Sequence, residues 1–276
     1  MITFPCSKIN LGLDIVSKRP DGYHNLETIF YPIPLEDALE ITVNNRADAP
    51  EYTFKMFNAT FKDGESDNLV VKAYKLLAAN HTLPKVDISL YKHIPTGAGL
   101  GGGSSDAAFT LKMLNKIASL NLTDEKLEEY AAQIGADCAF FIKARPAFAT
   151  GIGNILTPVD EYIKGYHLVL VKPDIHISTK EAYSLVVPSI PAVSLADTMS
   201  RPVNMWASSM KNDFERSVFA KFPETEKIKE NLYRMGALYA SMSGSGSSFF
   251  GIFDNPQDEK QIKTLFPDCF SMQCKL

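Results

Sequence analysis

The stretch PTGAGLGGGSSDAA, residues 95–108, contains five glycines and two serines and leaves a long piece of main chain nearly bare. Residues 86–90 before it alternate apolar and polar side chains as a β-strand does, and apolar residues after it recur at helical spacing from Ala107 to Ile117. The first N–H groups of a helix have no partner inside it and carry the positive end of its dipole. A bare loop leading into a helix therefore predicts an anion site, typically for a nucleotide phosphate, and a plain glycine-rich connection is the alternative.

Two familiar phosphate motifs do not describe this loop. The P-loop needs Gly-Lys followed by Ser or Thr, and the chain contains no such run. Gly97, Gly99 and Gly102 formally match the dinucleotide pattern G-x-G-x-x-G, but residues 120–125 look like helix and turn instead of a second strand ending in an acidic residue. A phosphoryl-transfer site normally offsets the charge of the transferred group with a cation and Mg²⁺, and the loop supplies no cation. Another segment must supply it, and Lys8 is a candidate.

The first part of the chain is rich in strands. From Ile9 to Ile15 apolar residues alternate with polar ones, which predicts a strand with one buried face and one polar face that carries Lys8 and Asn10. Further strands are expected at 26–31, 39–43 and 52–57, with a turn at 19–22 and a helix at 68–79. Ser104, Ser105 or Asp106 is expected to cap the helix after the glycine loop.

The second part contains another glycine/serine loop, residues 243–248, between expected strands 237–242 and 249–253. Helices are expected from Thr123 to Ile134, at 223–235 and at 257–265, and a strand at 167–171. The shift to glycine and polar residues at 150–157 predicts a domain boundary, with domains 1–153 and 154–276.

Composition excludes several functional classes. The net charge of −4 gives no basic excess for nucleic acid, and no apolar run reaches the roughly 20 residues of a membrane helix. The four cysteines form no CxxC, and the first residues do not read as a signal peptide. We therefore expect a cytoplasmic protein that has no nucleic-acid or membrane partner.

Three segments together resemble the GHMP kinase superfamily. Residues 95–108 resemble its phosphate loop, P-x-G-x-G-L-G-x-x-S-S-x-A-A, and residues 241–253, SMSGSGSSFFGIF, resemble its third motif. Residues 7–30, SKINLGLDIVSKRPDGYHNLETIF, and the Gly-Ala-Asp run at 135–137 are similar to the branch that phosphorylates the 2-hydroxyl of 4-diphosphocytidyl-2-C-methyl-D-erythritol with ATP. The resemblance implies an α+β, two-domain fold with the active site in a cleft between an N-terminal ATP-binding domain and a C-terminal domain. It also implies a place in the non-mevalonate route to isoprenoid precursors.

The resemblance implies two catalytic residues. By the resemblance Asp137 is the catalytic base. It stands alone beside an apolar run, so its carboxylate needs a cationic partner or would be neutral. Lys8 is that partner and holds the base or the acceptor hydroxyl. The alternatives are that Asp137 only orients the substrate or caps the next segment, and that Lys8 is an exposed lysine on an edge strand.

The implied cofactors are ATP and Mg²⁺. The expected ATP-binding residues are Asn68, Pro95, Gly97, Gly99, Leu100, Gly101, Gly102, Gly103, Ser104 and Ser105. Asn68 corresponds to an adenine-pocket position, and it also suits the N-cap of the helix that follows it. Ser105 is the expected Mg²⁺ ligand, whereas Asp106 is expected to point away from the phosphates.

The implied small-molecule substrate carries a cytosine base and a diphosphate. The expected substrate-binding residues are Asn10, Tyr23, His24, Thr179, Tyr183, Gly244 and Gly246. Tyr23 and His24 would form a platform for the base with Tyr183 on its other face, since a base stacked on an aromatic side chain gains about 1 to 3 kcal/mol. The alternative for Tyr23 and His24 is an exposed hairpin end.

Two other functions remain open at this stage. Another superfamily member would act on mevalonate, homoserine or galactose, or decarboxylate diphosphomevalonate, but those substrates lack the pyrimidine that Tyr23 and His24 fit. A catalytically inactive nucleotide-binding regulator is less consistent with the presence of both Lys8 and Asp137. We expect a monomer or a weak homodimer.

Overall fold

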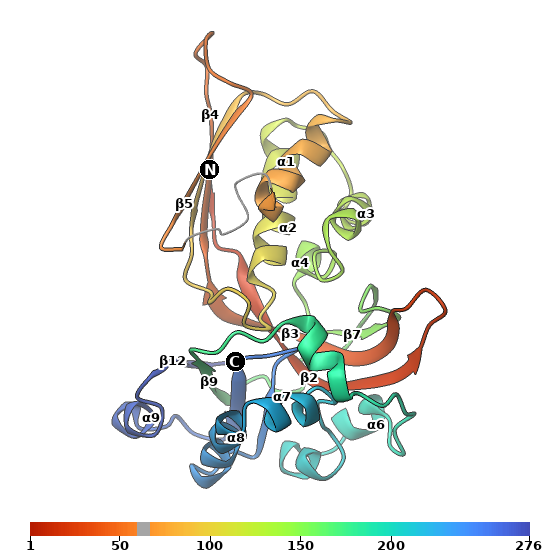
Figure 1. Cartoon of the computed structure of the whole chain (residues 1–276). Helices are drawn as coiled ribbons and strands as arrows, with labels where there is room; N and C mark the ends of the chain where they lie inside the picture. The colour runs from red at the N-terminus through yellow and green to blue at the C-terminus, as the bar shows by residue number, and fades with distance from the viewer. Residues whose placement is uncertain (60–66) are drawn as a thin grey trace. The chain divides into compact units, whose positions relative to one another are not determined.

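The computed structural model describes residues 1–59 and 67–276, and its helices and strands are drawn in Figure 1. The chain forms two compact units, each built from separate stretches of sequence. Unit 1 comprises Met1–Lys8, Leu35–Thr96 and Gly101–Arg145, and unit 2 comprises Ile9–Pro34, Gly97–Leu100 and Pro146–Leu276.

Unit 1 pairs a mixed sheet with helices. Its strands, in spatial order, are β1 (Ile2–Thr3), β4 (Ala38–Val43), β6 (Val86–Tyr91) and β5 (Tyr52–Phe57). Only the β5–β6 pair is parallel in this sheet of the described residues. Val86, Ile88 and Leu90 of β6 are buried while the residues between them are half-buried, as their alternation predicts. The strands expected at 39–43, 52–57 and 86–90 are therefore confirmed.

The helices of unit 1 are α1 (Leu69–Ala78), α2 (Gly102–Ile117), α3 (Asp124–Ile134) and α4 (Phe140–Lys143). Helices α1 and α2 pack against each other, and α2 also contacts β4. Asn68 and Thr123 cap α1 and α3 through their side chains, as expected.

Unit 2 contains two sheets. One has the order β2 (Cys6–Lys18), β3 (His24–Glu36), β7 (Ala147–Thr150) and β8 (Ile155–Pro158). The other has the antiparallel order β10 (Tyr239–Met242), β11 (Phe249–Phe253), β9 (His167–Pro173) and β12 (Cys269–Lys275). Leu13 and Ile15 of β2 share one hydrophobic core with Val169 of β9 and Leu232 of α8 (Glu224–Arg234).

The remaining helices of unit 2 are short. They are α5 (Thr179–Ala182), the 3-10 turns η2 (Tyr183–Leu185) and η3 (Val203–Ser208), α6 (Leu195–Met199), α7 (Glu215–Lys221) and α9 (Glu259–Leu265). Helices α8 and α9 confirm the expected helical segments, whereas α5, α6, α7 and β12 were not predicted from the sequence.

Two details differ from a simple reading of the sequence. The polar face of β2 is as buried as its apolar face, since Lys8, Asn10 and Asp14 are each 3% exposed. Residues 151–154, expected near a domain boundary, form the turn between the paired strands β7 and β8. The compact units thus divide the chain at other positions, and the functional division at 153/154 stays a prediction.

Candidate active site

The glycine loop has an alternating backbone conformation. Gly97, Gly99 and Gly101 have φ values of 62°, 75° and 71°, in the left-handed region that other residues rarely adopt. When left-handed residues alternate with right-handed helical ones, successive N–H groups point to the same side and form a concave anion site, and the glycines of this loop permit that conformation. Leu100 anchors the loop because its side chain is 1% exposed, and Pro95 at the start of the loop is half-buried.

Helix α2 begins earlier than its sequence predicts. Its N-cap is Gly101, which makes no side-chain capping bond, and Gly102 and Gly103 already belong to the helix. The expectation that Ser104, Ser105 or Asp106 caps the helix is therefore wrong. The left-handed Gly101 ends the loop by itself, so the helix can start without a capping side chain.

The start of α2 presents main-chain donors. The N–H of Ser105 donates to the Gly101 carbonyl at 2.9 Å, which closes the first turn, so the N–H groups of Gly102, Gly103 and Ser104 precede the ladder of helical bonds. Gly103 is exposed, and a methyl group built on it would lie 3.7 Å from the nearest side-chain atom, on Leu69. The helix start is thus open at Gly103 and suits a phosphate.

The position of Gly101 leaves no room for a larger side chain. A methyl group built there would lie 2.8 Å from Phe141 Cζ and 3.3 Å from Lys8 Cε. The loop therefore packs directly on the aliphatic stem of Lys8, within unit 1.

Lys8 and Asp137 form an ion pair, as the family resemblance implies. Lys8 Nζ lies 3.5 Å from Asp137 Oδ2, with the lysine side chain 4% exposed and the aspartate side chain 34% exposed. Burial lowers the pKa of Lys8, and Asp137 works against that shift. Asp137 is less buried than its apolar neighbours suggest, because it lies in the turn before α4 while Phe140, Phe141 and Ile142 carry the burial. Its carboxylate is thus accessible to a hydroxyl group.

The residues near the helix start fit a magnesium ion that is held mainly by phosphate. Ser105 is fully buried, and its Oγ has no hydrogen-bond partner among the described residues. Nowhere in residues 1–59 and 67–276 do three His, Cys, Asp or Glu side chains gather closely enough to hold a metal ion by themselves. Mg²⁺ commonly takes few protein ligands and completes its shell with phosphate oxygens and water, so a single unpartnered hydroxyl fits it.

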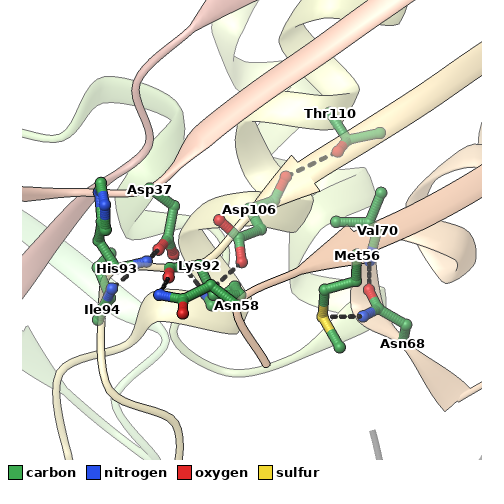
Figure 2. Close-up of polar contacts among 10 residues, drawn as sticks. All are labelled: Asp37, Met56, Asn58, Asn68, Val70, Lys92, His93, Ile94, Asp106 and Thr110. Carbon is green, nitrogen blue, oxygen red and sulfur yellow. Dashed lines mark hydrogen bonds and ion pairs between the residues drawn. The ribbon is translucent and has the colours of Figure 1, made fainter. Parts of the chain in front are cut away.

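A buried ionic network that sequence reasoning missed lies beside the same helix start (Figure 2). The ammonium of Lys92 bonds to both Asp37 and Asp106, and its distance to Asp106 Oδ2 is 2.7 Å. Asp37 Oδ1 also accepts the N–H groups of His93 and Ile94, at 2.5 and 2.8 Å. The expectation that Asp106 caps α2 is wrong, because the residue lies inside the helix and turns its carboxylate to Lys92.

The network carries one positive charge and two carboxylates. Burial opposes the charge of Lys92, but Asp106 and Asp37 outweigh it and raise the pKa of the ammonium. Burial raises the pKa of Asp106 to about 7, although Lys92 acts in the opposite direction. A methyl group on Gly102 would lie 3.3 Å from Lys92 Nζ, so the cation lies directly beneath the first turn of α2. A lysine three residues before Pro95 was the only sequence signal for it.

Asn68, expected at the adenine, is the N-cap of α1 in this structure. Its Oδ1 accepts the Val70 N–H at 2.9 Å, and its Nδ2 lies 3.8 Å from the sulfur of Met56 (Figure 2). The alternative interpretation of Asn68 as a cap is therefore confirmed, and the adenine contact stays a prediction.

In unit 2 the two glycine/serine segments and Asn10 come together. Ser243 Oγ donates to the Gly99 carbonyl at 2.9 Å and accepts the Asn10 N–H at 3.3 Å. Asn10 Nδ2 donates to Thr28 Oγ1 at 3.0 Å. A methyl group on Gly244 would lie 3.2 Å from Asn10 Oδ1, so glycine is needed for this approach. Gly246, with φ 91°, is likewise too crowded for a side chain.

The aromatic residues of unit 2 only partly match the expected platform. The rings of His24 and Tyr183 stack on each other, with centroids 4.8 Å apart and planes at 27°. Tyr23 is 64% exposed and is not part of this stack, and Thr179 is exposed at the start of α5. A base between His24 and Tyr183 requires the two rings to separate.

Comparisons with known proteins identify the family of the chain. Residues 68–145 match the family model described as GHMP kinases N terminal domain, and residues 194–268 match GHMP kinases C terminal. The protein named 4-diphosphocytidyl-2-C-methyl-D-erythritol kinase from Bacteroides fragilis is 58% identical over 276 residues, the full length of both chains. Its namesake from Porphyromonas gingivalis is 47% identical over 280 residues, covering 99% of this chain and 98% of the other.

Solved structures of GHMP kinases share the fold of this chain. A crystal structure of 4-(cytidine 5'-diphospho)-2C-methyl-D-erythritol kinase superposes with a TM-score of 0.85 at 30% identity, covering 99% of this chain and 98% of the other. The Methanococcus jannaschii mevalonate kinase superposes with a TM-score of 0.71 at 14% identity, covering 100% of this chain and 98% of the other, which shows a shared fold alone.

Proposed function

The chain belongs to the 4-diphosphocytidyl-2-C-methyl-D-erythritol kinase family of GHMP kinases, and on this premise we propose how its residues divide the work of the reaction. The expected α+β GHMP kinase fold is confirmed. The chain is an ATP-dependent phosphotransferase for the 2-hydroxyl of 4-diphosphocytidyl-2-C-methyl-D-erythritol, in the non-mevalonate route to isoprenoid precursors.

Asp137 would act as the base in direct in-line transfer. It accepts the proton of the 2-hydroxyl while that oxygen attacks the γ-phosphorus of ATP, and ADP departs with the electron pair of the broken P–O bond. Lys8 pairs with the carboxylate and offsets charge that develops at the transferred group. The observation that carries this proposal is the Lys8–Asp137 pair at 3.5 Å, whose lysine stem packs under Gly101 of the phosphate loop.

The glycine loop and the start of α2 would hold the phosphates of ATP. Support comes from the left-handed glycines and from the N–H groups of Gly102, Gly103 and Ser104, which lie ahead of the helical ladder. Mg²⁺, when bound, neutralises phosphate charge, and the Oγ of Ser105 is the protein ligand we propose for it. Asn68 would border the adenine.

The acceptor would be held by residues of unit 2. His24 and Tyr183 would enclose the cytosine, with Tyr23 and Thr179 at its edges, and Asn10, Gly244 and Gly246 would lie along the diphosphate and the methylerythritol. Support comes from the aromatic stack and from the tight packing of Gly244 on Asn10.

We also propose the domain boundary, the cellular location and the oligomeric state of the enzyme. Residues 1–153 would be the ATP-binding domain and 154–276 the C-terminal domain; the two matched family segments fall on either side of this boundary. No helix within residues 1–59 and 67–276 meets the length and apolarity that a membrane crossing requires. We propose that the enzyme works in the cytoplasm, as a monomer or weak homodimer, without a nucleic-acid or membrane partner.

Asp137→Asn tests the assignment of the base. The amide keeps the shape but cannot take a proton, so kcat should fall about 10²- to 10⁴-fold while KM for ATP stays within about twofold. Asp48→Asn, on an exposed loop residue of unit 1, is the matched control and should keep wild-type kcat.

Acceptor preference is measured on the same preparations. With Mg-ATP, ADP release is followed in the presence of 4-diphosphocytidyl-2-C-methyl-D-erythritol, mevalonate or homoserine. Retention of more than a tenth of wild-type kcat by Asp137→Asn would remove Asp137 as the base. Equal turnover of mevalonate would favour the alternative superfamily function.

A further inference from the structure

One side chain outside the expected site is hydrogen-bonded to the glycine/serine loop 243–248 and to the residue before it. Asn212 is 2% exposed, and its Nδ2 donates to the carbonyl oxygens of Met242 and Gly244, each at 2.8 Å. Its Oδ1 accepts the N–H of Phe214 at 2.9 Å. Since carbonyl oxygens only accept, this pattern fixes which end of the amide faces the loop.

These bonds determine the direction of a peptide group in the loop. The C=O and N–H of a trans peptide point in opposite directions. Because the Gly244 carbonyl points at Asn212, the N–H of Ser245 in the same peptide points away from it. No acceptor for this N–H is found among the described residues, and Ser245 is the half-buried member of a loop whose other residues are buried.

The turn that carries Asn212 is itself rigidly held within unit 2. Leu13 of β2 donates its N–H to the Lys211 carbonyl at 2.8 Å and accepts the Asp213 N–H at 2.9 Å. The Ile15 N–H donates to Asp213 Oδ2 at 2.8 Å. The turn is thus tied to the same strand that carries Asn10.

Glu215, three residues further on, strengthens the grip on the loop. Its Oε1 accepts the N–H of Met242 at 2.9 Å, and its Oε2 is paired with Lys229 at 2.7 Å. The N–H and the C=O of Met242 are therefore both hydrogen-bonded to the segment 212–215. The backbone has little conformational freedom where it enters the loop.

We propose that Asn212 is a positioning residue for the phosphoryl acceptor: by holding the carbonyls of Met242 and Gly244, it presents the Ser245 N–H as a hydrogen-bond donor to the diphosphate of the nucleotide acceptor. This inference rests on the proposed function of residues 243–248 in acceptor binding. Asn212 touches no substrate atom; it acts through the peptide between Gly244 and Ser245.

The test variant is Asn212→Asp, which keeps the size but replaces both donors with an acceptor. Two buried carbonyls lose their partner and face a carboxylate, so the loop peptide should turn. We expect kcat/KM for the cytidine diphosphate acceptor to fall about 10- to 100-fold through a higher KM, while KM for ATP changes less than about twofold. Asn255→Asp, on an exposed asparagine of unit 2, is the matched control and should retain wild-type values.

Two measurements distinguish a positioning role of Asn212 from a general loss of structure. A protonated aspartic acid has one O–H to donate, so the activity of Asn212→Asp relative to wild type should recover as the pH is lowered. Calorimetry with CDP and with cytidine as probes should show weaker binding of CDP alone, because only CDP carries the diphosphate. Asn212→Ser, which keeps one donor, should be intermediate and serves where the aspartate variant does not fold.

The outcomes are distinct. Unchanged CDP affinity in Asn212→Asp or Asn212→Ser would overturn the inference, and so would equal losses for CDP, cytidine and ATP. A wild-type enzyme that binds CDP but transfers no phosphate to the acceptor would refute the proposed function instead, while the CDP comparison would still decide the role of Asn212.

Discussion

Replacement of Lys92 by methionine should strongly destabilise unit 1. The side chains of Lys92, Asp37 and Asp106 are 6%, 0% and 3% exposed, so the ammonium is a buried cation between two buried carboxylates. Removal of one partner from a buried ionic network costs about 3 to 5 kcal/mol, because the remaining charge is left uncompensated. That is a large share of the roughly 5 to 15 kcal/mol by which folded proteins are stable.

The two carboxylates should respond differently to the loss. Asp37 keeps the N–H donors of His93 and Ile94, whereas Asp106 Oδ1 already has no partner among the described residues. The pKa of Asp106, about 7 in the wild type through burial, should therefore rise further. A carboxyl whose folded pKa lies above its unfolded value favours folding when protonated, so the loss in Lys92→Met should be largest at pH 8 and smaller at pH 6.

The assay is urea unfolding followed by far-UV circular dichroism at pH 6 and pH 8. Lys72→Met, on a lysine of α1 that is 46% exposed, is the matched control and should change the free energy of unfolding by less than about 1 kcal/mol. Lys92→Met/Asp106→Leu should recover part of the loss, because it removes the uncompensated charge. A loss below about 1 kcal/mol for Lys92→Met at both pH values would refute the electrostatic account of this network.

Three further predictions follow from single positions. Gly101→Ala should lower the free energy of unfolding by about 2 kcal/mol or more, because the alanine would be left-handed and its methyl group would lie 2.8 Å from Phe141. Gly103→Ala, the control, should leave the free energy of unfolding unchanged or higher. Equal urea unfolding midpoints for the two variants would contradict this. Asp14→Asn should stabilise the protein by about 1 to 2 kcal/mol at pH 7.5 but not at pH 4.5, because burial and Asp213 raise the pKa of Asp14 to about 6 and wild-type stability falls as pH rises through that value; parallel thermal-melting profiles would argue against it. Tyr183→Ala should raise KM for the cytidine acceptor about 10-fold with KM for ATP unchanged, measured by ADP release, and an unchanged acceptor KM would exclude Tyr183 from the base site.

Local sequence patterns predicted most of the long elements. The alternation in β2, β4, β5 and β6 and the helical spacing in α1, α3 and α8 were sufficient because each depends on neighbouring residues. The Lys8–Asp137 pair was predicted from the family resemblance, and the structure brings these residues together across 129 positions of sequence.

The parts that were missed depend on contacts between distant segments. Asp37 lies between β3 and β4, Lys92 directly follows β6, and Asp106 lies in the first turns of α2. Each alone looks like an ordinary charged residue. Asn212 looks like a common loop asparagine until Met242 and Gly244 are placed beside it. The early start of α2 was missed because glycine is a poor helix former, and its left-handed freedom at Gly101 outweighed that propensity.

The stack of His24 on Tyr183 has a consequence for inhibitor design. The two rings are stacked with their centroids 4.8 Å apart, so a flat ligand can bind between them only in conformations in which the rings have separated. The measured affinity of any such ligand equals its intrinsic affinity multiplied by the fraction of molecules with parted rings. A compound that binds the outer face of the closed ring pair avoids this penalty and should keep its affinity when the pair is cross-linked shut, whereas a ligand that binds between the rings should lose its affinity.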